Sequence, residues 1–273
     1  FGGGEPGVDG AEIRIRGMGT YGDKSPIVIV DGVERDMSYL APEEIETFTI
    51  LKDASATAPY GVRGANGVII VTTKRGKASE KPSVNFKASV GTNAPVKFPT
   101  YLGSADYATL YNEAMINSNP GTDPSKLELF TQDAINNYRM AKGDNSDGLG
   151  YNWDYFDYAF KPGIQQDYSL SIRGGSERAR YYVMANYYSQ DGNYEHTDLT
   201  EHDTQARFKR YNFRANVDVD ITKDFYVRVD LGARITDRHA PGTTASTVVS
   251  LCNTLPPYLP ITVPDNDNPD NED

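Results

Sequence analysis

Hydrophobic and polar residues alternate along five stretches of the chain between residues 84 and 235. Successive side chains of a β-strand point to opposite faces, so this period of two predicts strands with one apolar and one polar face. The polar members of the last two stretches include Arg214, Asp218, Arg228, Asp230 and Arg234. The apolar members, stretch by stretch, are Val84, Phe86, Ala88 and Val90; Tyr168, Leu170 and Ile172; Tyr181, Val183, Ala185 and Tyr187; Tyr211, Phe213, Ala215, Val217, Val219 and Ile221; and Phe225, Val227, Leu231 and Ile235.

The last two stretches each continue for about eleven residues, whereas strands of soluble domains average about five or six. About nine to eleven residues is the length of a strand that crosses a membrane. If Ile221 faces Phe225 across the turn at residues 222–224, Asp218 lies opposite Arg228 and forms a favourable cross-strand pair. The pattern therefore predicts apolar rows that face lipid and a polar face that lines a lumen.

The connections between these stretches alternate in length. Tight turns are predicted at residues 175–178 and 222–224, whereas residues 95–165, 191–207 and 240 onward form long connections. Outer-membrane barrels have short periplasmic turns and long external loops. Because the smallest single-chain barrels have about eight strands, five strands cannot close one. The predicted fold class is an antiparallel membrane β-barrel that is incomplete here, and we expect the chain, which begins at Phe1, to be a piece of a longer protein.

Residues 1–77 have a different sequence pattern, in which short β-rich runs are separated by clusters of Gly, Pro and Asp. Strands are predicted at residues 12–16, 27–30, 48–51 and 68–73, and short helices at Pro42 and at Asp53. This is a small α/β unit. The predicted organisation is thus residues 1–77 as one domain, 78–83 as a linker, and 84–273 as strands and long loops.

The first long connection is predicted to contain two helices. Ser104 is a plausible N-cap, and a second helix should run from Thr131 to about Lys142 and stop at Gly143. The expected buried stripe of the first helix consists of Tyr107, Leu110, Tyr111, Ala114 and Met115.

Composition narrows the function classes. The net charge of -11 disfavours recognition of a nucleic-acid backbone. The single cysteine, Cys252, excludes internal disulfides and a cysteine-based zinc site. A mean hydropathy of -0.56 would suit a soluble protein, but barrel strands need only every second residue to be apolar.

Several motifs favour structural interpretations over chemical ones. Residues 17–22 match the pattern G-x-G-x-x-G, but Asp-Lys-Ser-Pro and a strand follow where a dinucleotide-binding helix should begin, so we predict a flexible loop. The acidic segments 144–148 and 265–273 lack an EF-hand pattern and are predicted to be solvated loops. His196, His202 and His239 have no metal-ligand spacing. Without a catalytic, metal-binding or cofactor-binding constellation, the chain is predicted not to be an enzyme.

The chain has nineteen tyrosines, several of them at strand ends or in loops. For strand tyrosines such as Tyr187, Tyr188 and Tyr194, we favour an interfacial aromatic girdle over a ligand-stacking surface. For the loop aromatics the two interpretations stay open, and a ligand or a partner is the functional alternative. These loop residues are Tyr151, Trp153, Tyr155 and Tyr158.

Residues 13–77 resemble the plug domain of the SusC/RagA family of TonB-dependent outer-membrane transporters. The resemblance rests on Ile15-Arg16-Gly17, on residues 26–33 (PIVIVDGV), on residues 50–57 (ILKDASAT) and on residues 60–76 (YGVRGANGVIIVTTKRG). Residues 107–114, 167–175 and 211–216 look like the family's first external loop and early barrel strands. The motif positions expected to serve plug structure and gating are Arg16, Gly17, Asp31, Gly32, Lys52, Asp53, Tyr60, Gly61, Arg63, Gly64, Asn66 and Gly67.

The resemblance implies a barrel whose aqueous lumen is blocked at rest by the plug. We expect Asp31, Lys52, Asp53, Arg63 and Asn66 to contact a polar barrel wall through interactions that can be broken by pulling and formed again. The implied partners are TonB, through a segment absent from this sequence, and a SusD-like surface lipoprotein that covers the barrel. The implied location is the outer membrane of a Gram-negative bacterium.

The resemblance implies active import of a large nutrient, with an oligosaccharide favoured over a peptide. A siderophore or vitamin receptor is a second transport hypothesis. From another class, residues 83–240 could form a soluble β-rich glycan-binding module. That alternative requires two sheets packed face to face, and the charged rows make a poor sandwich core.

Overall fold

The structure is a computed structural model that describes residues 5–7, 13, 15, 25–37, 40–195 and 204–261. Two compact units are present. The first combines Phe1–Asn93, Gly163–Gly192 and Gln205–Ala240, and the second combines Ala94–Pro162, Asn193–Thr204 and Pro241–Asp273. These units group residues by spatial contact, so the domain boundaries at residues 77 and 83 stay a prediction. Among the described residues, no helix is both long and apolar enough to cross a membrane.

The first unit contains a small four-stranded sheet with the strand order β2-β1-β4-β3. Its strands are β1 (Ile27–Val30), β2 (Val33–Glu34), β3 (Ile45–Leu51) and β4 (Val68–Thr73). Short helical turns connect them: η2 (Pro42–Glu44), α1 (Ala54–Thr57) and η3 (Ala58–Asn66). The predicted strands and helix starts within residues 25–77 are confirmed, while the predicted strand at 12–16 lies largely outside the described residues.

The small sheet has an apolar core. Val30, Ile69 and Val71 are buried, and Ile13 and Ile15 pack against them among other partly buried residues. Because β1 and β4 are parallel and pair Val30 with Val71, their carboxyl ends lie side by side. This register places the residues that follow both strands close together.

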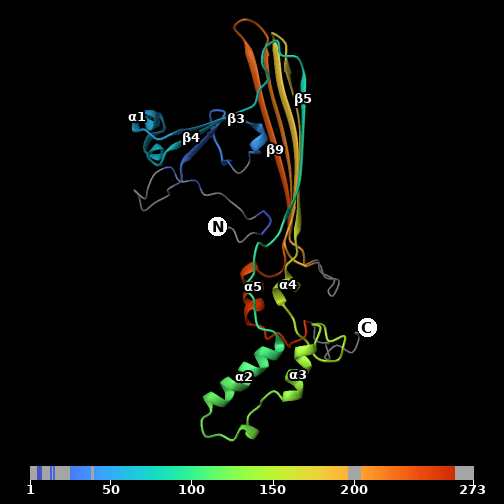
Figure 1. Cartoon of the computed structure of the whole chain (residues 1–273). Helices are drawn as coiled ribbons and strands as arrows, with labels where there is room; N and C mark the ends of the chain where they lie inside the picture. Colours follow the sequence, from blue (N-terminus) through green and yellow to red (C-terminus); the bar gives the residue numbers. More distant parts are fainter. Residues whose placement is uncertain are drawn as a thin grey trace, which may run out of the picture. The chain divides into compact units, whose positions relative to one another are not determined.

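The same unit contains a second sheet of five antiparallel strands in sequential order, hereafter the long sheet (Figure 1). Its strands are β5 (Ser83–Asn93), β6 (Gly163–Gly175), β7 (Ala179–Asp191), β8 (Arg207–Asp220) and β9 (Tyr226–His239). The last two contain 14 residues each, somewhat longer than predicted. Each β8 residue has one β9 partner, and Asp218 lies opposite Arg228, as predicted from the turn.

The alternation of the long sheet produces two different faces. On β8 the even-numbered Asn212, Arg214, Asn216 and Asp218 are buried, whereas Tyr211 and Phe213 remain 46% and 45% exposed. We call the face that carries Arg214 the inner face and the other the outward face. Within the part of the chain that the structure describes, no second sheet covers the outward face, which is inconsistent with the β-sandwich alternative.

The second unit is built from helices and long loops. Its elements are α2 (Ser104–Ser118), η4 (Pro124–Lys126), α3 (Gln132–Met140), α4 (Tyr155–Ala159) and α5 (Ala245–Thr254). The Thr131 hydroxyl accepts a hydrogen bond from the amide of Ala134, so the predicted start of α3 is confirmed. Helix α3 ends at Met140, slightly before the predicted end at Lys142.

The predicted N-cap of α2 is wrong, and the predicted stripe is confirmed only in part, because Tyr107, Tyr111 and Met115 are half-buried. The N-cap is Gly103, and the Asn152 side chain accepts a hydrogen bond from the Ser104 amide in place of a serine cap. The buried side of α2 consists of Ser104, Ala105 and Ala108, while Leu110 is 49% exposed and Ala114 is also exposed. Small residues face α3 because Ala105 and Ala108 pack closely against Ile135.

Candidate functional site

The first part of the candidate site is the turn between β1 and β2. Asp31 and Gly32 have positive φ angles of 50° and 87°, which a tight hairpin of this kind requires. The Asp31 carboxylate accepts hydrogen bonds from the amide of Thr73 (2.9 Å) and from its hydroxyl (2.6 Å). The parallel register of β1 and β4 therefore fixes the carboxylate at the edge of the small sheet.

Arg214 of β8 reaches this carboxylate from the long sheet. Its Nη2 donates to Asp31 Oδ2 at 2.6 Å and to Thr73 Oγ1 at 2.9 Å. The Arg214 side chain is only 4% exposed. Because a buried charge must be paired and hydrogen-bonded to be tolerated, this contact fixes the relative position of the two sheets at this point.

Asn216, two residues farther along β8, completes the arrangement. Its amide nitrogen donates to Thr73 Oγ1 (2.9 Å) and to the carbonyl oxygen of Lys74 (2.8 Å), and its Oδ1 accepts from Arg214 Nε (2.9 Å). The Thr73 hydroxyl thus donates once and accepts twice, which uses its full hydrogen-bonding capacity. We call Asp31, Thr73, Arg214, Asn216 and the adjacent Glu44 the Arg214 network.

Glu44 gives Arg214 a second carboxylate neighbour. Glu44 Oε2 lies 3.6 Å from Arg214 Nε, and Glu44 Oε1 accepts a hydrogen bond from the Ala41 amide at 2.6 Å. Burial raises the pKa of Glu44, although the Ala41 amide and the Arg214 charge oppose this shift. Glu44 is therefore protonated at a higher pH than an ordinary glutamate.

Gly232 of β9 leaves room for the Arg214 side chain. The two residues are paired across β8 and β9. A Cβ atom at position 232 would lie 3.4 Å from Arg214 Nη1. A methyl group would fit at that distance, whereas a larger side chain would push against the guanidinium group.

Arg75 forms a second cluster, which we call the Arg75 network. Its Nη1 lies 3.1 Å from Asp218 and its Nη2 lies 2.6 Å from Asp230. Arg228 Nε also donates to Asp218, at 3.0 Å, which confirms the predicted cross-strand pair. Arg75 follows β4 by two residues, so both networks hold the same end of the small sheet against the long sheet.

Further contacts surround these networks on the inner face. Lys87 of β5 pairs with Glu43 at 2.9 Å, and the Tyr182 hydroxyl of β7 donates to the Glu43 carbonyl oxygen at 3.3 Å. Tyr182 and Met184 also enclose Ala41 in an apolar cluster. Side chains from β5 and β7 of the long sheet thereby cover the segment around η2.

The structure brings some of the predicted plug and wall residues together. Asp31 meets Arg214, while Asp218 and Asp230 meet Arg75. Arg63 was expected to contact the barrel wall, but its guanidinium group forms a bidentate pair with Glu34 of β2. The pair forms because η3, which carries Arg63, packs beside β1, the hairpin partner of β2.

Of the other predicted positions, Arg234 lines the same cavity as Glu44 and Arg214, while the rest of those described take no part in the two networks. Lys52 and Asp53 are exposed between β3 and α1, and Arg234 lies on β9 opposite Asn212. Tyr60, Gly61, Gly64 and Asn66 belong to η3, and Gly67 follows it. Gly61 and Gly67 have positive φ angles of 64° and 97°. Arg16, Gly17 and the glycine pattern at residues 17–22 lie outside the described residues, as do His196, His202 and residues 265–273.

Sequence reasoning missed Thr73, Arg75, Asn216 and Glu44 as site residues. The signal for Thr73 was present, because aligning the apolar runs at residues 27–30 and 68–71 as parallel strands puts Asp31 beside Thr73. No sequence pattern predicted the contacts of Arg75, because its partners Asp218 and Asp230 lie more than 140 residues away in the sequence.

The loop aromatics belong to the second unit and pack among themselves. Trp153 lies 6.5 Å from Tyr151 and 5.6 Å from Tyr158, measured between ring centroids. The Tyr155 hydroxyl donates to the carbonyl oxygens of Pro256 and Leu259, and burial raises its pKa. Tyr155 therefore holds the segment after α5. The acidic loop at residues 144–148 likewise bonds to itself, since Asp144 accepts from Ser146.

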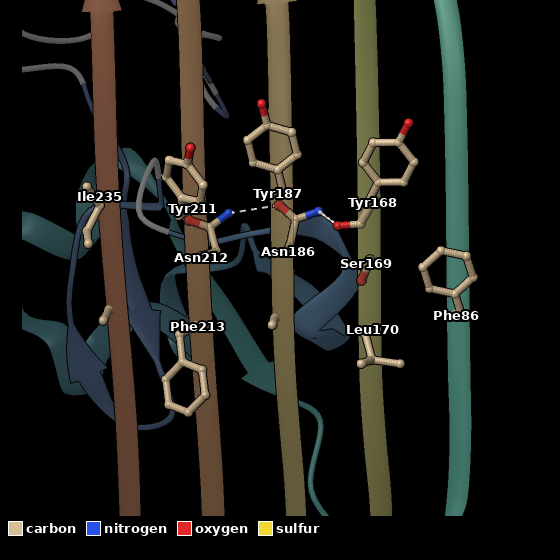
Figure 2. Close-up of a pocket in the computed structure, with 12 residues that line it drawn as sticks. Phe86, Tyr168, Ser169, Leu170, Asn186, Tyr187, Tyr211, Asn212, Phe213 and Ile235 are labelled. Carbon is tan, nitrogen blue, oxygen red and sulfur yellow. Dashed lines mark hydrogen bonds between the residues drawn. The ribbon is translucent and has the colours of Figure 1, made fainter.

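The outward face has a regular distribution of side chains. Tyr168, Tyr187 and Tyr211 are register partners on β6, β7 and β8, and their rings stand side by side as a tyrosine row (Figure 2). Below this row lie Phe86, Leu170 and Phe213 (Figure 2). Tyr168, Tyr187 and Tyr211 thus form a band, the arrangement that an aromatic girdle requires. Tyr188 does not join it, because it points to the other face of β7, where the Arg210 guanidinium lies 4.9 Å from the centre of its ring.

Comparisons with known proteins agree with this geometry. The family model of the TonB-dependent receptor plug domain matches residues 2–68. TonB-dependent receptor P3 of Formosa agariphila is 34% identical over 236 residues, which are 86% of this chain and 20% of that protein. TonB-dependent receptor SusC of Bacteroides thetaiotaomicron is 33% identical over 200 residues, which are 69% of this chain and 17% of that protein. The chain spans about a fifth of the length of these curated relatives.

Solved structures show the same likeness. The RagAB peptide importer in its "closed-closed" state superimposes with a TM-score of 0.70 at 25% identity, over 93% of this chain and 29% of that one. Its "open-open" state gives a TM-score of 0.64 at 27% identity, over 83% of this chain and 26% of that one. The chain belongs to the SusC/RagA family of TonB-dependent transporters. In this SusC/RagA chain the small sheet is part of the plug domain, and the long sheet is an open portion of the barrel. The family consists of transporters and not enzymes.

Proposed function

We propose that this chain supplies the plug and part of the barrel wall of an outer-membrane importer for a large nutrient. The observation that carries the proposal is the Arg214 network, which fastens the plug to the inner face of the wall through buried hydrogen-bonded charges. A plug held by polar contacts can be released and reseated without exposing a hydrophobic core. A purely apolar contact would lack the directional partners that define one closed position.

The outward face supports a membrane location. From Tyr211 to Ile221 the ten residue steps span about 33 Å along the strand, or about 25 Å of membrane depth at a tilt of 35–45°. The odd-numbered side chains over this distance are aromatic or aliphatic, and the exposed ones include Tyr211, Phe213 and Ile221. That height is the height of the apolar band of outer-membrane barrels. This agreement supports the proposed location in the outer membrane of a Gram-negative bacterium.

An oligosaccharide is the proposed nutrient class. The similarity to TonB-dependent receptors supports TonB-dependent import but does not distinguish the nutrient. An oligosaccharide is favoured by the tyrosine-rich loops of the second unit, because aromatic rings suit sugar rings. The proposed partners are a SusD-like lipoprotein, which would cover the external side, and TonB. The helical second unit is the proposed contact surface for the lipoprotein.

Deletion of the complete reading frame tests the proposal. A deletion strain should lose growth on one polysaccharide, keep growth on the corresponding monosaccharide, and recover when the wild-type gene is restored. Growth under limiting iron or limiting cobalamin should be unchanged, which separates the proposal from a siderophore or vitamin receptor. Normal uptake of every tested glycan and peptide by the deletion strain would refute an importer of large nutrients.

A peptide is the second candidate substrate class. It is favoured by the similarity to structures described as a peptide importer. Loss of growth on a protein hydrolysate, together with normal growth on glycans, would support it over the oligosaccharide.

A further inference from the structure

The chain between the end of β4 and the start of β5 is fastened to the hairpin of β6 and β7. Residues 77–80 form a tight turn, in which the Glu80 amide donates to the Lys77 carbonyl oxygen at 3.3 Å and Ser79 has a positive φ of 55°. The Gly175 amide, at the end of β6, donates to the Glu80 carbonyl oxygen at 3.0 Å. We call this attachment the linker clasp, and it consists of residues 76–80 together with Arg173, Gly174 and Gly175.

The Glu80 side chain adds an ion pair to the clasp. Arg173 Nε lies 3.0 Å and 2.9 Å from the two Glu80 carboxylate oxygens, and the Lys77 amide donates to Glu80 Oε2 at 3.1 Å. The Arg173 and Glu80 side chains are 22% and 26% exposed. Glu80 therefore receives hydrogen bonds both from the long sheet and from its own turn, which fixes the turn on β6.

Glycines allow the two backbones of the clasp to touch. A Cβ atom on Gly76 would lie 2.3 Å from the carbonyl oxygen of Gly174 and 2.5 Å from the amide nitrogen of Tyr181. A Cβ atom on Gly175 would lie 2.3 Å from the carbonyl oxygen of Lys77. Real Cβ atoms essentially never approach another heavy atom this closely, and backbone atoms cannot rotate away as a side chain can. Both segments are therefore adapted to a close approach of one backbone to another.

Movement of the plug requires a boundary between the part of the chain that moves and the part that stays. Strand β5 pairs with β6 from Ser83 to Asn93, so β5 stays with the barrel wall. Thr73 is the last residue of β4 in the plug, so the boundary lies between residues 73 and 83. Without an attachment, residues 76–82 would extend to about 25 Å, which is about the height of the apolar band.

We propose that the boundary is Gly76. During import the plug up to Arg75 leaves the wall, whereas residues 77–82 remain attached to β6 and β7. Glu80 and Arg173 are positioning residues, because they keep the end of β4 within reach of its wall partners and so guide the plug back to the Arg214 network. The proposal rests on the proposed function, since a boundary matters only if the plug moves.

Single-molecule force spectroscopy of the complete receptor in a supported bilayer tests the boundary. A handle placed before the plug would be pulled until β5 separates from the wall. We expect the wild-type trace to contain a separate last force peak of the plug, which releases about 25 Å, the extended length of residues 76–82. Arg173→Met should lose this peak, because the same residues then extend together with the plug.

Arg180→Met is the matched control for Arg173→Met. Arg180 lies on the same hairpin and is 24% exposed, but it pairs with Asp220 of β8 at 2.8 Å. Its trace should keep the peak, whereas Gly76→Ala, which tests the backbone contact independently of charge, should lose it. A wild-type trace without the peak, or a peak that both Arg173→Met and Gly76→Ala retain, would overturn the proposal.

Antibiotic sensitivity separates a positioning role from a general loss of stability. Vancomycin is excluded by an intact outer membrane, so sensitivity to it reports a plug that has not returned. We expect Arg173→Met to make cells sensitive when TonB is present and not when TonB is deleted, because the clasp acts only after the plug has been pulled. Equal sensitivity in both strains would show a merely structural role and would contradict the proposal.

The outcome can be separated from that of the proposed function. A receptor that restores import in the deletion strain, but shows no separate last force peak, would disprove the clasp alone. Normal uptake of every tested nutrient by the deletion strain would disprove the importer, and the role of the clasp in import with it.

Discussion

Arg214 makes three kinds of contact at once: with the Asp31 carboxylate, with the Thr73 hydroxyl and with the Asn216 side chain. Each contact comes from a group that is nearly removed from water. In such surroundings, removal of one member of a charge pair costs more than the pair itself contributes, because the remaining charge keeps its desolvation penalty. Arg214 is therefore more important for holding the plug in one position than for the free energy of unfolding of the whole protein.

Replacement of Arg214 by methionine should loosen the plug. The substitution keeps an unbranched chain but leaves Asp31 and Glu44 without their cation, at a cost of about 3–5 kcal/mol to the plug–wall contact. We expect cells that carry Arg214→Met to become sensitive to vancomycin, which normally cannot pass the outer membrane, and the purified receptor to show increased conductance in planar bilayers.

Arg63→Met is the matched control for this substitution. Arg63 pairs with Glu34 at the surface, where the two side chains are 70% and 50% exposed. Exposed pairs of this kind contribute about 0–1 kcal/mol, so antibiotic sensitivity should not change. Equal sensitivity of the two variants would contradict a specific role for Arg214.

Glu44 should make the plug–wall contact depend on pH. Burial raises the pKa of Glu44, so the folded protein binds this proton more tightly than the unfolded chain does. Stability should therefore fall as the pH rises from the usual glutamate range to the raised pKa, and should stay constant above it. Thermal unfolding of wild type and Glu44→Gln across this range measures the effect as a difference between the two proteins. Glu34→Gln, at an exposed site, should follow the wild-type curve, and identical pH profiles of wild type and Glu44→Gln would refute the assignment.

At the scale of elements, β8 and β9 position these groups through strict register. Arg214 lies opposite Gly232, and the absence of a side chain at that position leaves space for the guanidinium group. Glycine weakens the interior of a strand. At position 232 this cost is accompanied by the space that the Arg214 side chain needs. The local sequence of β9 is therefore adapted to a residue of β8.

Substitutions at Gly232 should have graded effects. Gly232→Ala should be tolerated, since its Cβ would lie 3.4 Å from Arg214 Nη1, an ordinary contact. Gly232→Val adds branched atoms that displace the guanidinium group, and should lower stability by about 1–3 kcal/mol. Gly91→Val on β5 is the control, because a Cβ there meets nothing within 4 Å. Denaturant unfolding of the three variants measures the difference, and equal stability of the two valine variants would contradict the steric explanation.

The sequence predicted the elements of the barrel wall better than the contacts between plug and wall. Alternation from Tyr211 onward predicted the strands, their two faces and the Asp218–Arg228 pair, because period and turn length are local properties. The burial of α2 was predicted only in part, because the fully buried residues at the contact with α3 are the small Ala105 and Ala108. The partner of Arg75 could not be predicted, since it depends on how two separately formed sheets meet.

At the scale of the whole first unit, the contacts with the wall are unevenly distributed over the plug. Thr73, Lys74 and Arg75 follow one another at the end of β4, and each bonds directly to β8. Helices α1 and η3 take no part in these three bonds. Release of the plug by force should therefore require the end of β4 to separate from Asn216 and Arg214, while α1 and η3 could move without breaking these bonds.

A disulfide between Thr73→Cys and Asn216→Cys tests this requirement in the complete receptor. The native side chains meet at 2.9 Å, and Cys252 is replaced by serine so that its thiol does not compete. If separation at this point is needed for import, oxidation should abolish uptake, and reduction should restore it. Val183→Cys with Ala215→Cys joins two register partners within the wall and should leave uptake unchanged under both conditions. The contrary result is that the oxidised Thr73→Cys, Asn216→Cys variant imports substrate as fast as the same variant after reduction. That result would show that the substrate passes while the end of β4 stays attached to the wall.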